Sequence, residues 1–235
     1  MLLSLAFSLQ KCTYHPFLPP GEIIEASSPN TNSKGQYIVS GGVGMATVPL
    51  GFTLADMMLK LKYGLTDKHQ LETSISLLSV AQDEEHRVNY SNKAINSYLG
   101  MRYLVVPKIL SIFSGIGIGG SSLGKYSSIN YGGSIGYENK FVVPFWQFYL
   151  YNAFPINPKK YDLSPKLAIA NTFVYTPLQT NGYKFDFGIK LPLSDWFHAE
   201  EKHSLGFSFG IASLHDSQRD AVAITLAAIF NYEIK

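Results

Sequence analysis

The segment 205–234 is a repeated alternation in which large apolar residues occupy every second position. In its second half, Val222, Ile224 and Leu226 share one face, whereas small or polar residues such as Thr225 occupy the other. A period of two predicts β-strands, and bulk on one face with small or polar residues on the other is typical of a transmembrane β-barrel wall. A soluble sandwich would place its bulk inside and cover its outer face with Lys and Glu.

The composition favours the same class of protein. The chain has 235 residues, which suffices for one barrel, and only 15% of them are charged, against about 25% in typical soluble proteins. Its 15 Tyr and 15 Phe suit an outer band that faces lipid and rims that carry aromatic girdles. A net charge of +2 gives no electrostatic basis for binding nucleic acid, so we expect no such partner.

The N-terminal part differs from the rest of the chain. Residues 1–12 read as a signal-like segment with an apolar core, and residues 13–35 are rich in Pro, Ser and Asn, which predicts a tether without regular structure. Cys12 is the only cysteine, and its position resembles that of the lipidated cysteine of bacterial lipoproteins. The alternatives for Cys12 are lipidation and no role. The sequence contains no apolar run of about 18 residues that could form a spanning helix.

From Gln36 to the C-terminus the alternation predicts a single all-β domain (residues 36–235), an antiparallel up-and-down barrel. Single-chain bacterial barrels have an even number of strands, whereas the pattern yields eleven candidates. We therefore expect twelve strands, with ten as the alternative. A missed strand would lie in 21–27 or 120–128; otherwise, two neighbouring candidates are one. The candidates are 37–46, 55–63, 71–77, 95–106, 110–119, 129–138, 141–154, 167–176, 183–193, 205–212 and 222–234.

Two phrases of the sequence carry a resemblance. The run Leu61–Asp67 followed by Leu71 and Glu72, and the glycine-spaced run 115–119, resemble the strand–turn–strand phrases of Gram-negative outer-membrane β-barrel proteins. The resemblance covers the chain from Gln36 onward and points to no particular member. It implies a location in the bacterial outer membrane and contact with outer-membrane lipid.

If the apolar faces point outward, nine charged residues point toward the lumen. They could form paired charges that close a narrow barrel, or line a pore whose slight excess of Lys and Arg favours anions. The predicted lumen-lining residues are Asp56, Lys60, Lys62, Glu72, Arg102, Glu138, Lys184, Asp186 and Lys190.

The segment 141–151 is bulky on both faces, so we expect contact with lipid or with a partner protein, including an oligomer, at Phe145, Trp146 and Phe148. His198 and the neighbouring acids read as a solvated loop rather than a metal site, and we predict neither a metal nor another cofactor. A hydrolase acting on lipid with rim histidines is a third reading, but the sequence identifies no catalytic residue.

The sequence thus predicts an outer-membrane barrel that is not an enzyme. It would be a small pore or a barrel that binds a solute or lipid. The alternative is a structural barrel that anchors and docks a partner complex.

Overall fold

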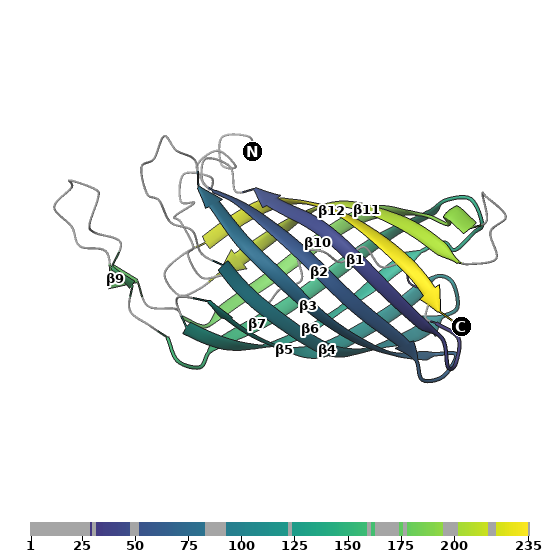
Figure 1. Cartoon of the computed structure of the whole chain (residues 1–235), viewed down its shortest axis with the longest axis horizontal. Coiled ribbons are helices and arrows are strands. Elements are labelled where there is room, and N and C mark those ends of the chain that lie inside the picture. The colour runs from purple at the N-terminus through teal and green to yellow at the C-terminus, as the bar shows by residue number, and fades with distance from the viewer. Residues whose placement is uncertain are drawn as a thin grey trace.

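The structure is a computed structural model, and it describes residues 29, 32–47, 52–82, 93–121, 124–158, 161–162, 174–175, 178–194, 202–215 and 220–234. Ten antiparallel strands close into a tilted barrel in the ring order β1-β12-β11-β10-β7-β6-β5-β4-β3-β2 (Figure 1). No helix among these residues is long and apolar enough to cross a bilayer. The barrel strands are β1 (Tyr37–Thr47), β2 (Phe52–Gly64), β3 (His69–Gln82), β4 (Lys93–Val106), β5 (Leu110–Ser121), β6 (Gly124–Gly136), β7 (Val143–Pro155), β10 (Thr180–Leu191), β11 (His203–His215) and β12 (Asp220–Ile234).

The barrel closes through the pairing of β1 with β12, from Tyr37 opposite Ile234 to Thr47 opposite Ile224. Closure pairs the backbone N–H and C=O groups of both edge strands, which a chain inside lipid requires because no water is present to satisfy them. We call the end of the barrel where β1 begins and β12 ends the terminal mouth. The short β2–β3 and β4–β5 turns also lie at this mouth.

The preferred count of twelve strands is wrong, and the alternative of ten is correct. β7 pairs directly with β10, from Thr180 opposite Ala153 to Lys190 opposite Val143, so no strand from 167–176 stands between them. Within that segment, the described residues Val174–Tyr175 form β9, which pairs only with β8 (Tyr161–Asp162) in a separate small sheet. Within the candidate region 120–128, residues 120–121 belong to β5 and residues 124–128 to β6, and the region 21–27 lies outside the described residues.

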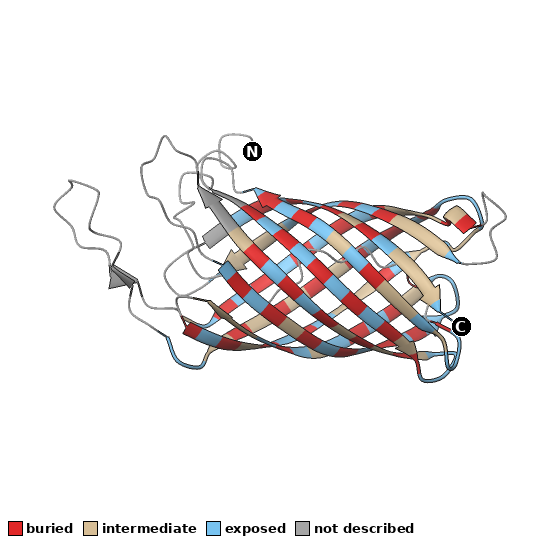
Figure 2. Ribbon diagram, in the orientation of Figure 1, coloured by how far each residue is buried: buried red, intermediate tan, exposed pale blue. Residues whose placement is uncertain are grey.

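The two faces of the wall alternate as the sequence predicts (Figure 2). On β12 the outward Leu226 is 52% exposed, whereas the inward Thr225 is 2% exposed. The barrel strands have 11 to 15 residues, and a tilted strand crosses a bilayer with about 9–11. Apolar bulk outside and polar or small residues inside therefore form a wall that is long enough to span a membrane.

Aromatic rings gather at the terminal mouth. Tyr37 and Tyr63 pack at a centroid distance of 4.5 Å, and His203 stacks on Tyr232 at 5.2 Å. Amphipathic rings favour the interface between lipid tails and water, where their polar atoms reach the headgroups. This rim therefore marks one boundary of the apolar band.

Glycines on the inner wall leave room for the aromatic rings of neighbouring strands. A Cβ atom at Gly115 would lie 2.6 Å from the Tyr98 ring, and one at Gly132 would lie 2.6 Å from the Phe113 ring. Such spacing is far below van der Waals contact, so only glycine lets these rings lie flat against the wall.

We expect Gly132→Leu to lower the free energy of unfolding by about 1–3 kcal/mol, because the new side chain must displace both the Phe148 carbonyl of β7 and the Phe113 ring. Gly41→Leu is the control, since nothing lies within 4 Å of a Cβ at that position. Urea unfolding from lipid vesicles measures both variants. Equal stability of the two would show that the ring does not need the glycine.

Candidate functional site in the barrel lumen

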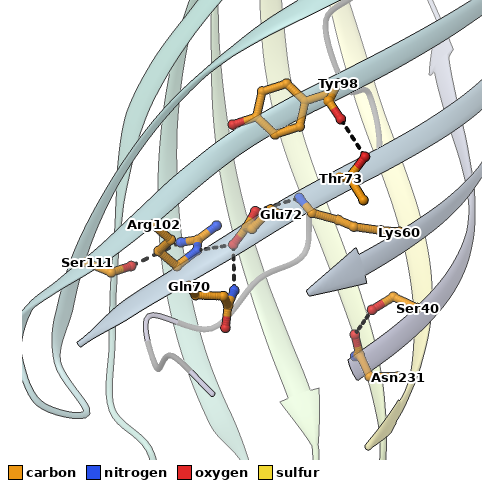
Figure 3. Close-up of polar contacts among 9 residues, drawn as sticks. All are labelled: Ser40, Lys60, Gln70, Glu72, Thr73, Tyr98, Arg102, Ser111 and Asn231. Atoms are coloured by element: carbon orange, nitrogen blue, oxygen red, sulfur yellow. Dashed lines mark hydrogen bonds and ion pairs between the residues drawn. The ribbon is translucent and has the colours of Figure 1, made fainter. Parts of the chain in front are cut away.

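The main polar site of the lumen is built around the Glu72 carboxylate on β3 (Figure 3). Its Oε2 atom lies 2.9 Å from Lys60 Nζ on β2, and its Oε1 atom lies 2.6 Å from Arg102 Nε on β4. Gln70 Nε2 donates a third bond to Oε1 at 2.7 Å. These four side chains are at most 2% exposed. One buried acid therefore holds two buried cations, and the contacts link three adjacent strands.

Weaker contacts extend this Glu72 cluster along the wall. Arg102 Nη1 donates to Ser111 Oγ on β5 at 3.0 Å, and its guanidinium lies over the Phe113 ring at 4.7 Å. The ammonium of Lys60 lies 5.7 Å from the centre of the Tyr98 ring. Each cation thus has both a charged partner and an aromatic face, which reduces the cost of removing it from water.

The chain before β1 reaches the same cluster. The backbone N–H of Asn32 donates to Gln70 Oε1 at 2.9 Å, and Asn32 Nδ2 donates to the Lys62 carbonyl at 3.3 Å. Pro29 lies beside the end of β6, three strands away from β3 in the ring, because a Cβ at Gly136 would be 3.0 Å from Pro29 Cδ. Both contacts lie at the terminal mouth, where β2 and β6 end and β3 begins.

A second charge pair stands on the other side of the barrel. Lys184 Nζ lies 2.8 Å from Asp186 Oδ2 on β10, and Thr225 Oγ1 on β12 donates to Asp186 Oδ1 at 3.2 Å. Strands β10 and β3 lie opposite each other in the ring order. The two clusters therefore face one another across the lumen; the Lys184–Asp186 pair is neutral, and Glu72 offsets one of the two cations that it binds.

Between the walls, apolar side chains meet in the lumen. Phe145 on β7, Met58 on β2, and Ala227 and Ile229 on β12 pack into one buried cluster. Because β7 and β2 are opposite in the ring order, a cluster that contains both Phe145 and Met58 spans the lumen. Phe145 is 1% exposed and Met58 is 5% exposed. The lumen is therefore filled at this level.

The structure gives positions to all nine charges that the sequence assigns to the lumen. Seven are buried on the inner wall: Asp56, Lys60, Lys62, Glu72, Arg102, Lys184 and Asp186. Glu138 and Lys190 instead lie at the terminal mouth, where they form a partly exposed pair at 3.3 Å. Glu138 falls in the β6–β7 turn because β6 ends at Gly136, two residues earlier than the expected strand.

The three aromatic residues expected at a lipid or partner contact separate onto two faces. Trp146 is 63% exposed on the outer wall and lies 5.8 Å from Phe187, while the Phe148 ring lies 4.7 Å from that of Phe185. Phe145 points inward into the cross-lumen cluster, so it contacts neither lipid nor an external partner. Adjacent positions of a strand face opposite sides, which explains the split.

Two positions singled out in the sequence, Cys12 and His198, lie outside the described residues. In the part of the chain that the structure describes, no three His, Cys, Asp or Glu side chains come together as a metal site would need. The sequence reading missed Gln70, Asn32 and Met58. The alternation along each strand places Gln70 and Met58 on the inner face, but their contact partners depend on the stagger between strands.

Comparisons with known proteins find similarity of backbone shape to solved structures, and no relative by sequence. No protein-family model matches the chain, and a search of curated proteins finds no relative. The solved structures with similar shape include the translocator domain of the autotransporter NalP from Neisseria meningitidis, with 10% identity, a TM-score of 0.49, and coverage of 87% of this chain and 89% of that one.

Two further structures each match over 86% of this chain and 99% of their own length, with 9% identity. They are the β domain of the Bordetella autotransporter BrkA, with a TM-score of 0.48, and the attachment invasion locus protein Ail of Yersinia pestis, with a TM-score of 0.36. These values assign no family or function to the chain. Its class follows from its own geometry, which is that of an outer-membrane β-barrel: a closed antiparallel wall with an apolar outside and a polar inside.

Proposed function

We propose that this protein is an outer-membrane barrel with a closed lumen, which binds or anchors at the membrane and does not serve as an open pore. The observation that carries the proposal is the cross-lumen cluster of Met58, Phe145, Ala227 and Ile229. A diffusion pore needs a continuous water-filled path, and side chains that meet from opposite walls interrupt it.

The charges support the same conclusion. Among the residues that the structure describes, the buried positive and negative charges on the inner wall are nearly equal in number. The cations are Lys60, Lys62, Arg102 and Lys184, and the acids are Asp56, Glu72 and Asp186. An anion-selective path would present unneutralised cations to passing solutes. Here Glu72 already holds Lys60 and Arg102 at ion-pair distance, so these cations contribute to the cohesion of the wall.

We expect no stepwise conductance from the folded wild-type barrel in planar bilayers at moderate voltage, because the lumen is blocked between β2 and β7. Folded material is identified by the mobility shift between boiled and unboiled samples on a gel. The variant Met58→Ser, Phe145→Ser removes the bulk of the block and should give small, frequent steps. Steady channels from the wild type would contradict the proposal.

A second candidate function is a gated passage for a small solute, and the Asn32 contacts favour it. If the chain before β1 is a gate, Gln70→Ala removes the acceptor of the Asn32 N–H and should raise the open probability. Thr73→Ala is a suitable control, because its hydroxyl bonds the Tyr98 carbonyl away from this contact. Equal, silent traces from both variants would support the permanently closed barrel.

A further inference from the structure

The outer wall carries a trough across the seam where β12 meets β1. Gly41 on β1 stands in register between Phe230 on β12 and Leu59 on β2, and one step along the wall Ala228 stands beside Val43. Gly41 and Ala228 face outward among bulky neighbours, and nothing lies within 4 Å of a Cβ at Gly41. The outer surface of the barrel is therefore recessed at this seam, and bulky side chains project on both sides of it.

Two adjoining cavities lie in this recessed part of the outer surface. One has a volume of about 680 Å³ and extends over β10, β11, β12, β1 and β2. The other has a volume of about 610 Å³ and extends from Leu205 and Phe230 to Ile75 and Leu77. Both are lined by Val43, Met57 and Ala228, so they form one continuous trough on the outside of the barrel.

We propose that an acyl chain of a phospholipid occupies this trough as a bound ligand. The outward side chains that line it are hydrocarbon or thioether, among them Val43, Met57, Leu59, Phe207 and Leu226, all of them at least 40% exposed. They offer no charged or hydrogen-bonding group to a polar ligand. An acyl chain needs none, and since its methylene groups are already out of water in the bilayer, it gains by close van der Waals packing along the trough.

The geometry disfavours the other membrane occupants. A peptide strand would need a free sheet edge for its backbone groups, and β1 and β12 are paired with each other along the seam. A second barrel presents a convex wall, which touches the ridges on either side and leaves the trough unfilled. A flexible chain can follow a trough that crosses several tilted strands.

The neighbouring rim provides a place for the lipid headgroup. Tyr37, Tyr63 and Tyr232 lie at the terminal mouth on β1, β2 and β12, the strands that carry the trough. Tyrosine at this depth can place its ring among the tails and its hydroxyl among the headgroups. The short turns at this mouth are typical of the periplasmic side, so the ligand is a phospholipid of the periplasmic leaflet.

The test is native mass spectrometry of barrels folded in vesicles of phosphatidylethanolamine and phosphatidylglycerol and extracted in mild detergent. We expect one retained phospholipid on the wild type. The variant Gly41→Phe, Ala228→Phe fills the trough and should reduce the retained fraction about tenfold, which corresponds to the loss of packing contacts worth about 1.4 kcal/mol. Ser114→Phe adds the same bulk to the exposed face of β5, on the far side of the barrel, and should leave retention unchanged.

A chain-length series provides a second measurement that needs no variant. Retention by the wild type should rise with acyl length, because a longer chain makes more packing contacts along the trough. Equal retention of short and long chains, equal retention by the filled variant, or loss of a second protein copy rather than of lipid would overturn the proposal. Lipid retention is independent of conductance, so its failure is distinct from failure of the closed-lumen function.

Discussion

Replacing Glu72 with Ala should lower the free energy of unfolding of the barrel by about 3–5 kcal/mol, because it leaves Lys60 and Arg102 buried without their anionic partner. Both cations are at most 2% exposed, so neither can recover its lost partner by turning toward bulk water. Gln70 also loses its acceptor, and Asn32 is held by Gln70. The substitution should therefore also loosen the chain at the terminal mouth. Urea unfolding from lipid vesicles, followed by tryptophan fluorescence, measures the loss.

The matched control for this variant is Glu138→Ala. Glu138 also pairs with a lysine, but at 3.3 Å and with side chains that are 13% and 23% exposed for Glu138 and Lys190. Partly solvated pairs contribute about 0–1 kcal/mol, so this variant should remain close to the wild type. Similar losses from both variants would mean that water reaches the Glu72 cluster freely, as it would in an open lumen.

The second large effect is expected on the outer wall. Leu226→Arg should cost about 2–4 kcal/mol, because the position is outward, 52% exposed in the middle of β12 and faces the hydrocarbon core of the bilayer. In a soluble protein the same exposed position would tolerate arginine with a change of about 0.5 kcal/mol or less. The sign and size of this one change therefore separate a lipid-facing wall from a water-facing one.

Ile234→Arg provides the control at the end of the same strand. Ile234 is 43% exposed and pairs with Tyr37 at the aromatic rim, where an arginine can reach the headgroups. We expect a cost of about 0–1 kcal/mol. If both arginines cost the same small amount, the outer face of β12 is not in lipid.

The fold was predictable from the sequence wherever each strand alternates strictly. Leu226 and Thr225 fall on the faces that their chemistry predicts, and most of the charges assigned to the lumen lie there. The strand count was not predictable in the same way. The segment 167–176 has a locally acceptable pattern, but membership of a barrel is decided by pairing, and β7 pairs with β10 instead.

The candidate site was predictable in its residue types and not in its contacts. Lys62 is the residue directly opposite Glu72 in the register, and Lys60, two residues further along β2, also reaches the Glu72 carboxylate at 2.9 Å. On β4, the residue directly opposite Glu72 in the register is Gly100, and Arg102 reaches Glu72 diagonally from two residues further along. Such diagonal contacts depend on side-chain length and strand stagger, which the pattern along one strand does not contain.

The cross-lumen cluster around Phe145 and Met58 was the feature least predictable from the sequence. Phe145 belongs to a segment that is bulky on both faces, and alternation alone does not say which face is inside. The structure turns Phe145 toward Met58 on the opposite wall and leaves Trp146 on the outside. A cross-lumen contact joins residues far apart in the chain, so it appears only once the barrel is closed.

Nitroxide accessibility along β12 tests most directly whether the wall faces lipid outside and a closed lumen inside. Labels are placed singly at 222–227 in a Cys12→Ser background, and their collisions with oxygen and with a water-soluble nickel chelate are compared in vesicles. Outward labels at Val222, Ile224 and Leu226 should collide with oxygen, which concentrates in lipid, whereas inward labels at Ala223 and Thr225 should collide with neither reagent. Strong collisions of inward labels with the chelate would reveal an open, water-filled lumen, and strong collisions of outward labels with it would place the wall in water; either result contradicts a closed transmembrane barrel.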